Sequence, residues 1–403
     1  MSDRPATLGD VARVFLKIGA MSYGVGIMGI MQSEVQEKRQ WLSKQQFVEG
    51  LALVNMLPGP PGVQLSIFLG HAKGSLIGGI LAGLCFILPA FFIVLALSTA
   101  YVAFGTLPTA QSAFYGIGPV VVGIFAVSVY RLGRNTVKER AQIAILVAAA
   151  ALILLTPVSL VATLLAAGCV GIALFHSRRI GLISLAVLIA TVASYEVFAP
   201  LLTAASVSGS GTPVHASGTP GLGQLAAFFF EVGAFSFGGG LSMLAFIQDQ
   251  VVNQFGWLTP QEFIDGLALG QLTPGPVLML AAFIGFKLSG VQGAAVAASA
   301  IFLPSFIMML AILPLLQKMK DLQWLRAFMR GAGPAVIGAL AVSLMQMAPH
   351  AAPDVFTWVV LALTIALILL RNAGALPLMV GGGAIGLLIR TTRVWERIAS
   401  FAW

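Results

Sequence analysis

Long apolar runs separated by short polar segments dominate this chain of 403 residues. Crossing a lipid bilayer as a helix takes about 20 apolar residues. Residues 76–130 contain no charged side chain and leave room for two such helices, divided near Pro108. The other continuous runs are 141–175 (divided at Thr156-Pro157), 180–200, 288–316, 331–349, 355–370 and 372–389. The pattern predicts an all-α polytopic membrane protein.

Two further regions are apolar but interrupted by Gly and Pro: 11–31 with 46–72, and 225–247 with 261–287. Counting both as crossings gives about 13 transmembrane segments, although 46–72 and 261–287 could instead re-enter from one side. Residues 203–224, rich in Ser, Gly, Thr and Pro, are predicted to be a loop. We therefore expect three parts: an N-terminal repeat with an extra connecting span (1–200), an inter-repeat loop (201–222) and a C-terminal repeat (223–403).

The two apolar halves are repeats of each other. Gly19-Ala20-Met21-Ser22-Tyr23-Gly24 aligns with Gly233-Ala234-Phe235-Ser236-Phe237-Gly238, and Pro58-Gly59-Pro60 aligns with Pro274-Gly275-Pro276. Leu88-Pro89 and Gly118-Pro119 recur as Leu303-Pro304 and Gly333-Pro334. The offset stays near 215 residues for over a hundred positions, which chance similarity between apolar segments would not produce.

Basic residues predict that the repeats are inverted. The loop at 131–140 carries Arg131, Arg134, Lys138 and Arg140, whereas the loop at 104–112 has no Lys or Arg; in the second half the equivalent loops reverse this pattern. Cytoplasmic loops collect Lys and Arg. Inverted repeats with interrupted helices are common in secondary transporters, which bind substrate near the bilayer midplane where the broken helices meet.

Composition narrows the class of protein further. Charged residues make up only 9% of the chain and apolar residues 58%, far from a soluble globular protein. The net charge of +8 is accounted for by loop Lys and Arg, so we expect a lipid bilayer rather than nucleic acid as the partner. The four His show no metal-ligand spacing, and no Walker A sequence or nucleophile elbow is present. We therefore predict no enzyme activity, no metal and no cofactor.

The Pro-Gly-Pro segments are the main candidates for substrate binding. Pro ends a helix and removes a backbone donor, and such breaks at membrane depth are tolerated only against protein or a watery cavity. A helix that begins after the break directs its N–H groups at that cavity, where they favour an anion. A structural kink is the alternative. The candidate residues around the two breaks are Asn55, Pro58, Gly59, Pro60, Gln64, Gln271, Thr273, Pro274, Gly275 and Pro276.

Glycine clusters precede each break and form a second candidate set. Their members are Ser22, Gly24 and Gly26 in the first half and Ser236, Gly238 and Gly239 in the second. Glycine permits close approach of backbone to a ligand, but small residues also favour close helix packing in membranes. We expect one or both roles.

Four ionisable residues within or beside the apolar regions are candidates for charge compensation or coupling. Lys17 and Glu231 are equivalent in the repeats and could pair across the pseudo-twofold axis, act separately on substrate and proton, or extend to a membrane interface. Glu49 and Asp265 are also equivalent and precede the breaks. Either could carry a coupling proton, because desolvation raises a carboxyl pKa, or cap a helix at the surface.

These motifs resemble the chromate ion transporter family in its long, two-repeat form. The resemblance covers nearly the whole chain and is closer in the second half, at Phe237-Gly238-Gly239-Gly240, Gly256-Trp257-Leu258 and Thr273-Pro274-Gly275-Pro276. In the first half the usual Phe-Gly-Gly-Pro of the family reads Tyr23-Gly24-Val25-Gly26. That departure leaves room for a shifted substrate preference.

The resemblance implies chromate efflux across the cell inner membrane, with chromate resistance as its result. We expect a secondary transporter, an antiporter in type, that works by alternating access; the coupling ion stays open. A transporter of sulfate or another oxyanion is the alternative within the class, and an anion channel is the alternative outside it. A homodimer is a further expectation from the resemblance and from general habit.

Overall fold

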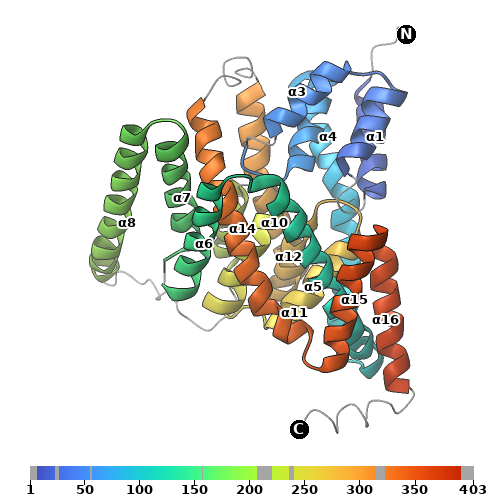
Figure 1. The fold of residues 1–403 in the computed structure, drawn as a ribbon. Coiled ribbons are helices and arrows are strands. Elements are labelled where there is room, and N and C mark those ends of the chain that lie inside the picture. The colour runs from blue at the N-terminus through green and yellow to red at the C-terminus, as the bar shows by residue number, and fades with distance from the viewer. Residues whose placement is uncertain are drawn as a thin grey trace.

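The computed structural model describes residues 7–22, 27–54, 57–156, 158–206, 220–235, 240–313 and 323–391, and every regular element within these ranges is helical. The first half contains α1 (Leu8–Met21), α2 (Ile27–Met31), the π-helix η2 (Gln32–Lys38), α3 (Lys44–Val54), α4 (Pro61–Phe104), α5 (Pro108–Thr136), α6 (Arg140–Leu155), α7 (Leu160–Phe175) and α8 (Arg178–Ser206). α8 and α16 lie at opposite edges of the molecule (Figure 1).

The second half repeats this order. It contains α9 (Leu222–Ala234), α10 (Gly240–Gln248), the π-helix η3 (Asp249–Gln254), α11 (Pro260–Leu272), the short η4 (Val277–Met279), α12 (Leu280–Ile312), α14 (Gln323–Ala351), α15 (Val355–Arg371) and α16 (Ala375–Thr391). Local sequence explains several helix starts: Pro occupies the first turn of α4, α5 and α11, where its missing N–H costs nothing.

The predicted helix boundaries at Pro108 and Thr156-Pro157 are confirmed, since α5 begins at Pro108 and α6 ends at Leu155. α8 extends to Ser206, into the segment predicted as a loop, and residues 207–219 lie outside the described ranges. Among the described residues, four segments are long and apolar enough to cross a bilayer: 61–104, 108–136, 277–312 and 323–351. Five shorter apolar helices accompany them, so a count near 13 stays a prediction.

The outer surface has the apolar character of a membrane protein. Leu155 and Val355 are each 81% exposed and Leu370 is 83% exposed, which in water would mark an aggregation or interaction surface. The interior is also apolar and includes the fully buried rings of Phe86 and Phe283. Apolar side chains on both faces of the long helices are expected when lipid replaces water outside.

Each long helix after a Pro-Gly-Pro segment is broken a second time. α4 departs from helical dihedrals at Gly74 and Ser75, and α12 does so at Ser289 and Gly290. The residue with positive φ is Ser75 (55°) in one case and Gly290 (61°) in the other. Both regions that the sequence predicted to be broken therefore consist of short helices ahead of a long one, and the two breaks occur at equivalent positions.

Equivalent helices of the two halves pack against each other in opposite directions. A methyl group on Gly118, near the start of α5, would lie 3.7 Å from the carbonyl oxygen of Ala351 at the end of α14. A methyl on Gly333, near the start of α14, would lie 2.9 Å from Cγ2 of Thr136 at the end of α5. α5 and α14 are therefore antiparallel. The two contacts are equivalent to each other, because Gly118 corresponds to Gly333 and Thr136 corresponds to Ala351 at the repeat offset of about 215 residues.

Close glycine contacts between the halves also occur in equivalent pairs. Gly116 on α5 packs so closely on α16 that an added methyl would clash with the carbonyl oxygen of Gly382. The equivalent Gly331 on α14 packs on α7, where the clash would be with the carbonyl oxygen of Ala167. Each half therefore packs its last helices on the central helix of the other half, with small residues at the closest approach.

Candidate functional site

The two Pro-Gly-Pro breaks have the same backbone shape. Gly59 has φ of 126° and Gly275 has φ of 113°, values that side-chain-bearing residues rarely adopt. Gly59, Pro60, Gly275 and Pro276 are buried. The glycine therefore permits a reversal of the chain inside the protein, directly before α4 in one half and η4 in the other.

Each break contacts the long helix of the opposite half. A methyl group on Gly59 would lie 2.5 Å from Oγ of Ser305 on α12, and one on Gly275 would lie 2.7 Å from Cβ of Ala90 on α4. Ser305 and Ala90 are equivalent, each following a proline inside its helix. The amide of Gly275 also donates a 2.6 Å hydrogen bond to the carbonyl oxygen of Ser22 at the end of α1. Residues far apart in the sequence thus meet at both breaks.

Three side chains at the breaks each have a buried oxygen atom without a hydrogen-bond partner among the described residues. Ser22, Gln64 and Ser305 each have 0% exposure, and Oγ of Ser22, Oε1 of Gln64 and Oγ of Ser305 have no hydrogen-bond partner among the described residues. Buried polar atoms are nearly always paired, and each exception calls for an explanation such as a ligand, an ion or ordered water. Ser98, farther along α4, is a fourth such residue.

The other described substrate-binding candidates are buried or half-buried. Thr273 is buried, but its hydroxyl donates to the carbonyl oxygen of Leu269 at 2.7 Å and so completes the end of α11. Gln271 is half-buried and Pro274 is buried, whereas Pro58 is half-buried. Gly24, Gly26, Asn55, Ser236, Gly238 and Gly239 lie outside the described residues.

Lys17 pairs within its own half. Its ammonium group lies 3.0 Å from Oε1 of Glu34, which also accepts from Lys38 at 2.8 Å. The Lys38 and Lys17 ammonium groups hold the pKa of Glu34 below its usual value. Glu231, the equivalent of Lys17, is exposed. Lys17 therefore pairs with a carboxylate on the π-helix η2 and not with Glu231 in this structure, and no local pattern had indicated Glu34.

Glu49 and Asp265 occupy similar local positions with different surroundings. In each, the amide of a glutamine four residues earlier donates to the carboxylate, from Gln45 to Glu49 at 3.2 Å and from Gln261 to Asp265 at 3.0 Å. Glu49 is half-buried, whereas Asp265 is only 6% exposed. The Tyr101 hydroxyl, on the first-half helix α4, donates to Asp265 at 2.8 Å.

A cavity of about 430 Å³ opens beside Asp265. It lies between the end of α4, the start of α5, the start of α11 and the end of α14, and its polar lining includes Tyr101, Glu262 and Lys287. Lys287 forms a 2.9 Å ion pair with Glu262. α11 is not among the apolar helices long enough to span, and burial at the edge of this cavity raises the pKa of Asp265 to about 6.

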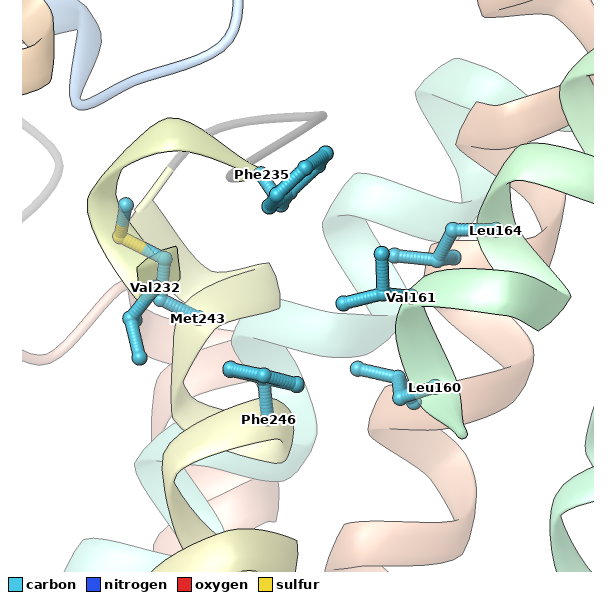
Figure 2. Close-up of a pocket in the computed structure, with 7 residues that line it drawn as sticks. All are labelled: Leu160, Val161, Leu164, Val232, Phe235, Met243 and Phe246. Carbon is cyan, nitrogen blue, oxygen red and sulfur yellow. The ribbon is translucent and has the colours of Figure 1, made fainter. Parts of the chain in front are cut away.

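A second, much smaller cavity is apolar. It measures about 10 Å³ and is lined by Leu160, Val161, Leu164, Val232, Phe235, Met243 and Phe246. Figure 2 shows the α7 side chains facing those of α9 and α10 across the gap, with no polar side chain among the residues drawn. A space large enough for about one water molecule and without hydrogen-bond donors does not suit an oxyanion.

Sequence comparison now gives the family. A model of the chromate transporter family matches residues 9–172 and 223–387, one match in each half. This chain belongs to the chromate transporter family. The family is one of transporters rather than enzymes, and the paired match establishes that the chain carries two repeats of the family's sequence.

Named relatives agree over most of the length. The chain is 34% identical to a chromate transport protein of Cupriavidus metallidurans over 94% of this chain and 92% of that protein. It is also 34% identical to a probable chromate transport protein of Synechococcus elongatus, over 88% of each. A chromate transport protein of Pseudomonas aeruginosa is 31% identical over 83% of this chain and 79% of its own length. No solved structure matches the chain.

Two residues of the site were missed by sequence reasoning. Ser305 directly follows the recognised Leu303-Pro304 pair, and a comparison with Ala90 after Leu88-Pro89 would have drawn attention to its hydroxyl. Tyr101 lies in an apolar run, 164 positions from Asp265. No local pattern indicates that contact.

Proposed function

We propose that this protein is a secondary transporter that exports chromate across the cell inner membrane by alternating access between inverted repeats. Membership of the chromate transporter family supports the substrate, and so do the chromate transport proteins among its relatives. The observation that carries the mechanism is that each buried Pro-Gly-Pro break contacts the long helix of the other half, at Ser305 and at Ala90. A relative movement of the halves would remodel both breaks together.

The inverted arrangement is supported by charge as well as by helix direction. Arg330 near the start of α14 forms an ion pair with Glu139 just before α6, so the basic segment 131–140 lies on the same side as the start of α14. Cytoplasmic loops are rich in Lys and Arg, which makes this side the cytoplasm. The 430 Å³ cavity at the start of α5 and the end of α14 then opens toward the outside.

Outward movement suits an anion electrically. Each negative charge that leaves a cell with a negative interior gains about 2.3 kcal/mol per 100 mV of membrane potential. Export of chromate therefore needs little further coupling, and a coupling proton, if used, has Asp265 as its carrier. Helix N-termini at the breaks supply N–H groups and partial positive charge for the substrate. A homodimer is proposed as the assembly.

Uptake of radiolabelled chromate into everted membrane vesicles tests the function, with and without excess sulfate and under imposed pH and potential gradients. Saturable uptake against a chromate gradient is expected for an exporter. Uptake of sulfate without chromate would keep the fold and overturn the substrate. Flux that saturates weakly and cannot be driven uphill would identify a channel, and no flux from folded protein would overturn transport of either anion.

A further inference from the structure

The polar groups at the two breaks are distributed unequally. Counting from the Pro-Gly-Pro segments, Gln64 of the first half corresponds to Leu280 of the second. Counting from the prolines within the long helices, Ser305 corresponds to Ala90. The first-half break therefore has a buried amide and a buried hydroxyl where the second-half break has two apolar side chains, although the two backbones are alike.

The orientation of the Gln64 side chain is determined by its surroundings. Nε2 lies 2.5 Å from the carbonyl oxygen of Pro58, and only the NH₂ end of an amide can donate to a carbonyl. The opposite atom, Oε1, is buried and has no donor among the described residues. An added methyl on Gly59 would clash with Nε2 of Gln64 and would lie 2.5 Å from Oγ of Ser305, so both side chains lie at the turn of the break.

An unpartnered Oε1 needs a hydrogen-bond donor, because an amide oxygen can only accept. A fully deprotonated tetrahedral dianion consists of acceptors alone and would face this oxygen with no donor between them. A singly protonated oxyanion carries one O–H group and three acceptor oxygens. The Ser305 hydroxyl can donate to one of those oxygens, as can the N–H of Gly62 in the first turn of α4. Pro61 has no N–H, and those of Val63 and Gln64 already donate to the carbonyl oxygen of Pro60.

We propose that the first-half break binds the transported oxyanion as its singly protonated monoanion. In this complex Oε1 of Gln64 accepts a hydrogen bond from the O–H group of the anion, and the Ser305 hydroxyl donates one to another of its oxygens. The inference rests on the proposed chromate transport and names the ionic form of the substrate. Chromate takes up a proton close to neutral pH, whereas sulfate and selenate, of the same shape, do so only in strong acid. The site therefore selects chromate over sulfate and selenate because only chromate carries an O–H group near neutral pH. A site built to pair with an O–H group rejects analogues that lack it.

The test is equilibrium binding of radiolabelled chromate to the purified full-length protein in detergent, at constant total chromate between pH 6 and pH 9, with selenate as competitor. Once the monoanion is the minor species, the apparent Kd for chromate should rise about tenfold per pH unit, in proportion to the competent fraction. Selenate should compete at least tenfold less well at every pH. Equal competition by selenate, or a Kd that does not change with pH, would overturn the monoanion.

Selenate also reports titration of the protein. The titratable residues on the elements packed around this break, α1, α3, α4, α9, α11 and α12, are Asp10, Arg13, Lys17, Lys44, Glu49, His71, Lys73, Cys85, Tyr101, Glu231, Glu262, Asp265 and Lys287. A change in any of these would alter binding of chromate and selenate in parallel, because both are tetrahedral anions. The pH dependence expected here belongs to chromate alone.

Variants that copy the other half identify the residues. Ser305→Ala and Gln64→Leu each introduce the residue found at the corresponding position of the other half, Ala90 or Leu280. We expect each to weaken chromate binding at least tenfold and Gln64→Leu to reduce the preference over selenate. Ser98→Ala, which removes a buried hydroxyl without a described partner farther along α4, should leave both unchanged. Thermal unfolding and gel filtration verify folding of each variant.

The outcomes separate this inference from the proposed function. If wild-type vesicles accumulate chromate while folded Ser305→Ala and Gln64→Leu bind and transport it as the wild type does, the site assignment is wrong and the export function stands. If wild-type protein neither binds nor transports chromate, the proposed function itself fails. Normal binding with lost transport in the variants would contradict the assigned contacts.

Discussion

The two breaks have one backbone geometry and two chemistries. Both place a glycine of positive φ against the long helix of the opposite half, but the buried Gln64 and Ser305 at the first break correspond to the apolar Leu280 and Ala90 at the second. Duplicated backbone shape points to a shared mechanical role, because both breaks must accommodate any relative movement of the halves. The unequal side chains point to substrate contact at one of them. The comparison separates residues that let the protein move from residues that select what is moved.

The largest effect is expected from Gly59→Leu and Gly275→Leu. Each leucine would have to adopt a backbone conformation that costs on the order of 1–3 kcal/mol and would contact Ser305 or Ala90 at 2.5 or 2.7 Å. Both variants should abolish chromate transport in vesicles while protein remains in the membrane. Gly381→Leu is the control, because no atom of the described residues lies within 4 Å of its added methyl. Normal transport by both break variants would refute a shared role.

A smaller, paired effect is expected at the helix crossings. An alanine at Gly116 or at Gly331 would force a carbonyl oxygen of the opposite half to move, and overpacking typically costs about 1–3 kcal/mol. Thermal unfolding in detergent should show a similar loss for Gly116→Ala and Gly331→Ala. Gly381→Ala should not show it, since its position is open. A loss at only one of the two would contradict the equivalence of the halves.

The pH dependence of unfolding and of transport is expected to distinguish Asp265 from its equivalent, Glu49. Burial raises the pKa of Asp265 to about 6 from its usual 3.8, so between these values the folded protein binds more protons than the unfolded chain. The contribution of Asp265 to stability therefore falls as pH rises through this window. Asp265→Asn should remove that part of the pH dependence of unfolding. If Asp265 carries a proton during transport, the same variant should also flatten the transport profile near pH 6.

Glu49→Gln is the matched comparison for this effect. Glu49 has the same glutamine neighbour but is half-buried, whereas Asp265 is only 6% exposed. Substitution of Glu49 should leave the profile near pH 6 unchanged. If both variants transport with the wild-type pH profile, both carboxylates return to a structural role.

Features determined by local sequence could be predicted. Pro108 begins α5 and α6 ends just before Thr156-Pro157, because proline removes a backbone donor and is favoured at helix boundaries. The Pro-Gly-Pro segments mark the breaks for the same reason, whereas Pro89 and Pro304 lie inside α4 and α12. The repeat could be read because the Gly and Pro motifs recur at an offset that stays near 215 residues. The second break at Ser75 was not predicted, since positive φ at a serine is a cost that the surrounding fold must impose.

Contacts between the halves could not be read from the sequence. Tyr101 meets Asp265 across 164 positions, and Ser305 meets Gly59, because two helices of opposite halves pack side by side. Both depend on the tertiary arrangement, for which apolar periodicity carries no signal in a chain that is apolar toward lipid and core alike. A Lys17–Glu231 pair was suggested because the two residues are equivalent in the repeats. Equivalent positions need not be in contact, and Lys17 pairs with Glu34 instead.

The smallest effect on stability is expected from removing the charge of Glu34 or of Glu231. Glu34→Gln removes the carboxylate that accepts from Lys17 and Lys38, and because both ammonium groups are substantially exposed the loss should be about 1 kcal/mol or less. The pKa of Glu34 is lowered, so its contribution is present above the usual value of 4.5 and is lost as pH falls below it, opposite in sign to Asp265. Glu231→Gln, on an exposed side chain, should not change unfolding at pH 7. A larger loss for Glu231→Gln than for Glu34→Gln would show that the second-half charge, not the first, is held by a partner.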